Sequence, residues 1–134
     1  MKHHFLIFMA AVLLFSCEKS RKEIIHGGSY KYWLEKDRTF PCKLYNYFDK
    51  EGKWTVYLSG ANGPFEEYNG YDNLIRKRWD IIDDSIMIIS ATKAKIVKIN
   101  EDMFILKYPT KLDTFISVDE DLTPPKYRCI HDLR

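Results

Sequence analysis

The side chains with catalytic potential in this chain of 134 residues do not form a recognisable catalytic set. After the first sixteen residues only His26 and His131 remain as imidazoles, and neither lies in a segment whose pattern predicts rigid placement. A general base must be held within hydrogen-bond reach of its substrate. Acidic pairs such as Asp83-Asp84 stand in predicted turns, where carboxylates hydrogen-bond the local backbone. We therefore expect a non-enzymatic protein with no catalytic residues and no cofactor.

Residues 1–16 have the pattern of a removable signal. Lys2 precedes an uninterrupted apolar run from Phe5 to Phe15, which is too short to cross a hydrocarbon core of about 30 Å. The run ends in Leu14-Phe15-Ser16-Cys17, which resembles the bacterial lipobox. That resemblance implies that Cys17 is lipidated, becomes the first residue of the mature chain and attaches it to a membrane. The alternative is a free cysteine beside an ordinary signal peptide.

With Cys17 assigned to lipid, Cys42 and Cys129 remain as a pair. Disulfides persist outside the cytoplasm, and a bridge between these two would hold a Pro-rich C-terminal segment that has little else to fix it. Closing so long a loop is worth about 4–5 kcal/mol on the chain-entropy model. Two separate buried thiols are the alternative. No CxxC motif or nearby histidine accompanies either cysteine, so we expect no metal site.

Composition divides the chain into three parts. Behind the signal, residues 17–27 are polar and mixed in charge, which predicts a lipidated cysteine followed by a flexible tether. Residues 28–134 are expected to form one globular domain. The 21 basic and 19 acidic residues leave a formal charge of +2, which provides no electrostatic footprint for nucleic acid. The chain after Cys17 lacks the acidic run that resembles a surface-export signal of some bacterial lipoproteins, which favours a domain that faces the periplasm. The expected location is the outer membrane.

The elements that must position any site are predicted to be strands. Apolar residues recur at a period of two, and no helical period follows the signal. Eight short strands are expected at 30–35, 43–48, 53–59, 76–82, 85–90, 94–99, 103–108 and 113–118. Closing eight strands on themselves removes the sheet edges, so we expect an all-β fold, an eight-stranded antiparallel up-and-down barrel. A β-sandwich is the alternative, although it needs longer Greek-key connections.

The interior of this barrel is the first candidate for binding. Trp54 and Trp79 are expected to point inward, together with Phe48, Leu58, Ile88 and Phe104. In a barrel of eight strands such side chains either fill the interior or leave room for one small ligand. Both outcomes stay open from the sequence.

Two further candidates lie outside the barrel. The loop 59–73 has no strand pattern, and its Phe65, Tyr68 and Tyr71 would form a lid or a protein-binding loop. Its acidic residues lack the spacing of a calcium loop. A tyrosine-bearing outer face, formed by Tyr45, Tyr47 and Tyr57, is a candidate protein interface because interfaces are enriched in tyrosine.

Several segments together resemble the small bacterial lipocalin-like lipoproteins. These are the lipobox, the Gly28-Ser29-Tyr30 entry to the first strand, and the hairpins at 47–53 and 79–86. The lipocalin entry motif is Gly-x-Trp, and here Tyr30 stands at the tryptophan position with Trp33 three residues later. The resemblance implies a barrel that binds a small apolar molecule or a protein partner without catalysis.

The sequence therefore predicts a lipid-anchored protein of the bacterial cell envelope that acts as a binding module. Its partner would be a small apolar ligand or an envelope protein, contacted through Trp54, Phe65, Tyr68, Tyr71 and Trp79. The alternative is an inhibitor or immunity protein that blocks an enzyme with an exposed loop. For this alternative, the segment Ser59-Gly60-Ala61 resembles part of the inhibitory loop of bacterial lysozyme-inhibitor lipoproteins.

Overall fold

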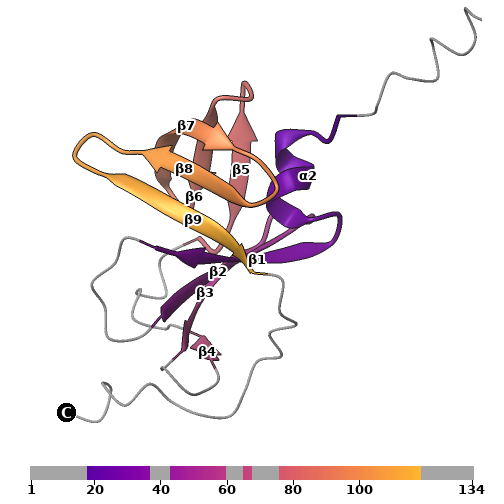
Figure 1. Cartoon of the computed structure of the whole chain (residues 1–134), viewed down its shortest axis with the longest axis vertical. Coiled ribbons are helices and arrows are strands. Elements are labelled where there is room, and N and C mark those ends of the chain that lie inside the picture. Colours follow the sequence, from indigo (N-terminus) through magenta and orange to yellow (C-terminus); the bar gives the residue numbers. More distant parts are fainter. Residues whose placement is uncertain (1–17, 37–42, 60–64, 68–75, 119–134) are drawn as a thin grey trace, which may run out of the picture.

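The secondary structure is almost entirely antiparallel strand. The computed structural model describes residues 18–36, 43–59, 65–67 and 76–118 of the chain (Figure 1). Within these ranges it has one helix and nine strands: α2 (Arg21–His26), β1 (Tyr30–Glu35), β2 (Lys43–Asp49), β3 (Trp54–Ser59), β4 (Phe65–Glu67), β5 (Trp79–Ile82), β6 (Ile86–Ile89), β7 (Thr92–Ile99), β8 (Met103–Lys107) and β9 (Leu112–Val118).

All nine strands belong to one sheet, in the order β4-β3-β2-β1-β9-β8-β7-β6-β5. The first strand pairs with the last, since Tyr32 lies opposite Val118. The two remaining edges meet at an antiparallel bridge between Lys53 and Arg78, next to which the Trp79 amide donates to the Gly52 carbonyl oxygen at 3.0 Å. Eight strands thus form a nearly closed barrel, as predicted, and a two-sheet sandwich is ruled out. The short β4 extends the sheet beside the far end of β3.

Turn chemistry fixes the register of the hairpins. Gly52, between β2 and β3, has φ +86°, and a Cβ built there would lie 3.4 Å from the Trp79 carbonyl oxygen. Asp83 and Asp84, between β5 and β6, have φ values of 52° and 55°. The Ser85 amide donates to the Ile82 carbonyl oxygen at 3.2 Å, so the two aspartates are the central residues of a tight turn within the three-residue connection. Two consecutive positive φ values match the twist of the paired strands. Both turns were predicted from the sequence, and both are confirmed.

The segment expected to be a flexible tether is instead partly helical. Ser20 Oγ accepts from the Glu23 amide at 3.2 Å, and Glu23 Oε2 accepts from the Ser20 amide at 2.8 Å, which makes a capping box. The helix α2 ends at Gly27, which has φ 61°. Because this box satisfies two amides that a six-residue helix leaves unpaired, α2 forms despite its length. The prediction of a tether is therefore wrong for residues 21–26.

Helix α2 covers one end of the barrel, where it contacts β1, β2 and β5 (Figure 1). Ile25 is fully buried, and its carbonyl oxygen accepts from the Trp33 indole N–H at 2.8 Å. Phe48 and Phe104 are also fully buried and pack against each other edge to face beneath the helix. We call this side the helix end, and we call the opposite side, which no described helix covers, the open end.

The inward-facing positions agree with the predicted pattern except on β6. Trp54, Leu58 and Trp79 belong to the buried core, as expected. On β6 the buried residues are Met87 and Ile89, so Ile88 lies on the outer face and its assignment to the interior was wrong. The continuous apolar run of β6 gave no alternation from which to choose the inner face.

Candidate functional site

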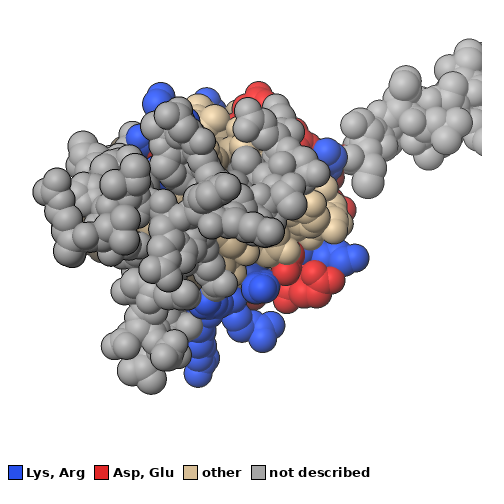
Figure 2. Space-filling model, turned by 90° about the horizontal axis from the view of Figure 1, so that it is seen from below, with Lys and Arg blue, Asp and Glu red and all other residues tan. Residues whose placement is uncertain are grey.

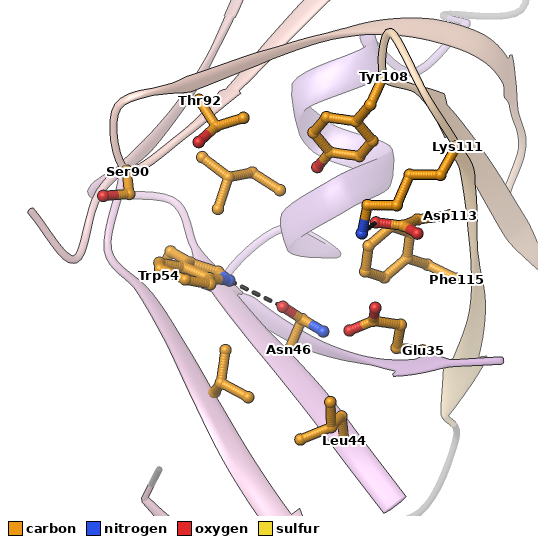
Figure 3. A pocket seen from close by; sticks show the side chains of 12 residues that line it. Glu35, Leu44, Asn46, Trp54, Ser90, Thr92, Tyr108, Lys111, Asp113 and Phe115 are labelled. Carbon is orange, nitrogen blue, oxygen red and sulfur yellow. Dashed lines mark hydrogen bonds and ion pairs between the residues drawn. The ribbon is translucent and has the colours of Figure 1, made fainter. Parts of the chain in front are cut away.

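A cavity of about 290 Å³ lies inside the barrel at the open end (Figure 3). It is bounded by the end of β1, the start of β2, the inner face of β3 and the turns that follow β6 and β8. Five of its twelve lining residues are apolar, namely Leu44, Trp54, Val56, Ile89 and Phe115. The other seven are polar or charged, namely Glu35, Asn46, Ser90, Thr92, Tyr108, Lys111 and Asp113. A concave, mixed surface of this size suits a small ligand.

The floor of the cavity is made by the aromatic core. Phe115 lines the cavity and stacks on Phe104, with ring centroids 4.4 Å apart and planes 7° from parallel. Phe104 in turn packs edge to face against Trp33 at 4.8 Å. The core therefore fills the barrel toward the helix end and stops at Phe115. This combines the two outcomes that the sequence left open, because one part of the barrel is packed and the other is hollow.

Asn46 and Trp54 form the polar centre of the cavity wall (Figure 3). The Trp54 indole N–H donates to Asn46 Oδ1 at 2.9 Å. Asn46 is only 4% exposed, and within the described part of the chain its Nδ2 has no hydrogen-bond partner. A buried amide nitrogen without an acceptor is uncommon in folded proteins. The residues that line the cavity thus include one buried donor without a described partner.

Charged groups of both signs line the same cavity near β9. Lys111 Nζ lies 2.7 Å from Asp113 Oδ2 and 5.1 Å from the centre of the Tyr108 ring. Asp113 is buried, whereas Lys111 is exposed. Glu35, at the end of β1, contributes a second carboxylate to the lining (Figure 3). The lining therefore holds two carboxylates and one ammonium group.

Of the residues predicted to bind a ligand or partner, the structure brings only Trp54 to this cavity. Trp79 lies at the helix end, where its indole N–H donates to the Asp49 carbonyl oxygen at 2.9 Å. Phe65 begins β4, and nothing is described of its side chain. Tyr68 and Tyr71 fall outside the described residues, as do Cys17, Cys42 and Cys129. Lipidation and the disulfide stay predictions.

A second, shallower pocket of about 210 Å³ lies beside α2, where His26 and Trp79 meet with ring centroids 6.2 Å apart. The Gly28 amide donates to His26 Nδ1 at 3.0 Å, so this imidazole is held in place, contrary to the expectation that it lies in a loose segment. The lysine and carboxylate groups around the pocket are engaged with one another. Lys22 pairs with Asp80 at 2.6 Å.

The ion pairs of this region attach α2 to the barrel. Besides Lys22 with Asp80, Lys19 lies 2.6 Å from Glu101 in the turn after β7. The hydrogen bond from Lys22 lowers the pKa of Asp80, and that from Lys19 lowers the pKa of Glu101. Figure 2 shows charged groups of both signs side by side on the face seen from below, with Lys and Arg gathered along its lower edge.

The predicted tyrosine-bearing outer face exists, and its tyrosines differ widely in exposure. Tyr45, Tyr47 and Tyr57 lie on the outside of the barrel with Tyr30 and Tyr32, in a second apolar cluster. Tyr45 is only 9% exposed, while Tyr30 is 51% exposed. Burial raises the pKa of Tyr47 to about 12, and the nearby Asp49 carboxylate contributes to the rise. These tyrosines mainly contact one another.

The polar lining of the cavity was missed from the sequence, although two residues carried a signal. Asn46 occupies an inward position between Leu44 and Phe48 on β2, and Asp113 occupies one beside Phe115 on β9. A polar residue at an inward position of a strand marks either a satisfied network or a site. Glu35 and Lys111 lie at strand ends, where polar residues are ordinary.

Comparisons of this chain with protein-family models, with curated proteins and with solved structures found no match. Among the described residues, no three His, Cys, Asp or Glu side chains are grouped so that they could hold a metal ion. None of the helical residues described forms a segment of the length and hydropathy that crossing a membrane requires. What the cavity can bind is therefore inferred from the residues that line it.

Proposed function

We propose that this protein is a non-catalytic binding module that takes a small ligand into the open end of its barrel. The observation that carries the proposal is the 290 Å³ cavity, with Trp54 and Val56 on its apolar wall and the unsatisfied Asn46 amide on its polar wall. Eight-stranded barrels of this shape hold one small molecule when their interior is not filled. The nearly closed antiparallel barrel is consistent with the lipocalin-like fold that the sequence resembles.

The second part of the proposal is an anchored location in the bacterial cell envelope, through a lipid on Cys17. The contact between Lys19 and Glu101 places the start of the described chain at the helix end. Cys17 directly precedes Glu18, so a lipid on it attaches the barrel by that end. The cavity opens at the other end. An anchored barrel would therefore take its ligand from the aqueous side and not from the membrane that holds it.

Native mass spectrometry tests the binding function. The protein is purified from an oxidising compartment as the Cys17→Ser variant, which removes the lipid but keeps α2. We expect a co-purified adduct of a few hundred daltons. The variant Val56→Phe, which places a larger side chain in the cavity, should lose the adduct, whereas Thr55→Val on the outer face of the same strand should keep it. An adduct retained by folded Val56→Phe would show that the ligand binds elsewhere.

Fractionation tests the anchor separately. We expect the wild-type protein in the membrane fraction, because two or more acyl chains give stable attachment. The same chain with a cleavable signal peptide that has no lipobox in place of residues 1–17 should be in the soluble periplasmic fraction. A wild-type protein found soluble would overturn the lipid anchor without affecting the cavity. The inhibitor or immunity alternative depends on loop 59–73, of which only Ser59 and β4 are described, so it stays a prediction.

A further inference from the structure

The geometry of the cavity points to the chemical class of its ligand: a compact, non-anionic molecule with one apolar face and a carbonyl or hydroxyl oxygen that accepts from Asn46. This inference rests on the proposed binding function and adds to it a prediction about the head group. It differs from the expectation of a purely apolar ligand, because seven of the twelve residues that line the cavity are polar or charged.

The orientation of the Asn46 amide is fixed by its neighbour. The Trp54 indole has only a donor, and it lies 2.9 Å from Asn46 Oδ1. Reversing the amide would place its NH₂ group against that indole N–H, which leaves both donors without an acceptor. The bond with Trp54 therefore turns Nδ2 toward the other polar residues that line the cavity (Figure 3).

The unsatisfied nitrogen favours a ligand with an acceptor. Asn46 is 96% buried, and no described residue accepts from its Nδ2. An unmade hydrogen bond at a buried donor is costly, and a ligand oxygen placed there recovers that cost on binding. A hydrocarbon of the same shape leaves the donor unpaired. Selection by a buried polar group is stronger than selection by apolar shape alone.

The charges of the lining act against an anionic head group. Asp113 is buried and already engaged by Lys111 at 2.7 Å, so this ammonium group is shared with a carboxylate of the protein. Glu35 adds a second negative charge to the wall. A carboxylate ligand would be desolvated beside two like charges, which disfavours its binding. Fatty acids and other small carboxylates are therefore poor ligands.

The remaining wall accepts an apolar face. Trp54, Val56 and Ile89 line it together with Leu44 and Phe115. Trp54 serves both walls, since its N–H is bound to Asn46 while its ring lies along the apolar side. A ring that carries one oxygen substituent matches this division, with the oxygen at Asn46 and the ring against Trp54.

Three probes of similar size separate these contributions: acetophenone, ethylbenzene and benzoate. Each is titrated into the full mature chain carrying Cys17→Ser, and binding is followed by two-dimensional ¹H–¹⁵N NMR of the Trp54 indole and the Asn46 side-chain amide. We expect acetophenone to bind roughly three- to tenfold more tightly than ethylbenzene, which corresponds to one net hydrogen bond. Benzoate should bind more weakly than acetophenone. Only acetophenone should shift the Asn46 NH₂ resonances strongly.

Two variants test the assignment to Asn46. In Asn46→Leu the preference of acetophenone over ethylbenzene should disappear, because the donor is gone. Thr55→Val, a matched control on the neighbouring strand with its side chain outside the cavity, should keep the preference in full. If Asn46→Leu does not fold, the Asn46 NH₂ shifts of the unsubstituted residue decide the question.

The outcomes distinguish this inference from the proposed function. Equal affinities for acetophenone and ethylbenzene, with shifts at Trp54, would overturn the inference and leave the binding function intact. Benzoate binding as tightly as acetophenone would overturn it as well. If none of the three probes moves any cavity resonance at millimolar concentration, both the inference and the proposed binding site are overturned.

Discussion

The two ends of the barrel are built from the same strands but differ in how their interior is filled. At the helix end Ile25, Trp33 and Phe104 are almost without exposed surface, and the Trp33 indole N–H is satisfied by a backbone carbonyl oxygen. At the open end Asn46 and Asp113 are buried beside a cavity, and Asn46 keeps an unpaired donor. One end is optimised for packing, and the other retains polar groups that packing alone would not select.

The largest expected effect is a loss in the free energy of unfolding, compared between an isoleucine truncated at each end of the barrel. Ile25→Ala should reduce the free energy of unfolding by about 3–5 kcal/mol, because Ile25 is fully enclosed between α2 and the core. Ile89→Ala should cost about 2 kcal/mol, because Ile89 already borders the cavity and loses fewer neighbours. Urea unfolding of both variants measures the difference. Equal losses would show that the open end is as tightly packed as the helix end.

The second comparison concerns an indole hydrogen bond. Trp33→Phe should destabilise the protein by about 1–3 kcal/mol, because it leaves the buried Ile25 carbonyl oxygen without its donor. Hydrogen exchange should accelerate selectively at the Ile24 amide, which bonds to the Ser20 carbonyl oxygen in α2. Binding of acetophenone at the open end should be unchanged. A loss of that binding would mean that the two ends are coupled.

A smaller effect on stability is expected at Thr55, whose hydroxyl has no described partner and does not line the cavity. Thr55 is buried on the outer face of β3, and its Oγ1 has no partner among the described residues. Thr55→Val should therefore stabilise the protein by about 0.5–1 kcal/mol, because it removes the desolvated hydroxyl and keeps the shape. Thermal unfolding checks this. A destabilised variant would show that the hydroxyl is satisfied in solution.

The smallest effect is a pH dependence confined to the helix end. The pKa of Asp80 is lowered by the hydrogen bond from Lys22. A lowered pKa in the folded state adds stability above the ordinary value of 3.8, and this stability is lost as the pH falls through the lowered value. Because both side chains are more than half exposed, Asp80→Asn should cost only about 0.2–1 kcal/mol. Glu51→Gln in the adjacent turn is the control.

Exchange of the α2 amides measures this effect across an acid titration. In the unsubstituted protein, protection should decrease as the pH falls below the ordinary pKa of Asp80, whereas Asp80→Asn should lack that step. The Glu101 carboxylate, whose pKa is lowered by Lys19, contributes a parallel step. A titration identical in both proteins would show that this ion pair does not hold the helix.

Much of the barrel could be predicted because its strands alternate. The hairpin at Gly52, the turn at Asp83-Asp84 and the closed antiparallel order follow from period-two patterns and turn residues. The helix was missed because six residues cannot show a helical period. Its signal was the Ser20 and Glu23 spacing of a capping box just before Ile24 and Ile25.

The candidate site was predicted less well than the fold. Trp54 was assigned to the interior correctly, but nothing in the sequence separated it from Trp79, which lies in the pocket beside α2 and not in the cavity lining. Asp113 and Asn46 stood at inward positions as polar exceptions, and these exceptions mark the site. Which inward polar residues lie close together depends on the strand register and on how the barrel closes, and neither can be predicted from the residues of one strand alone.

The pairing of β1 with β9 has a consequence for how the chain acquires its structure. Tyr32 and Val118 belong to the first and the last strand along the described sequence, yet they lie side by side in the sheet. Contacts of such high sequence separation form slowly, because the intervening chain must first be ordered. The first strand therefore stays without one of its two neighbours until the last strand has been synthesised. A nascent chain of this protein therefore cannot complete its barrel until the residues of β9 have left the ribosome.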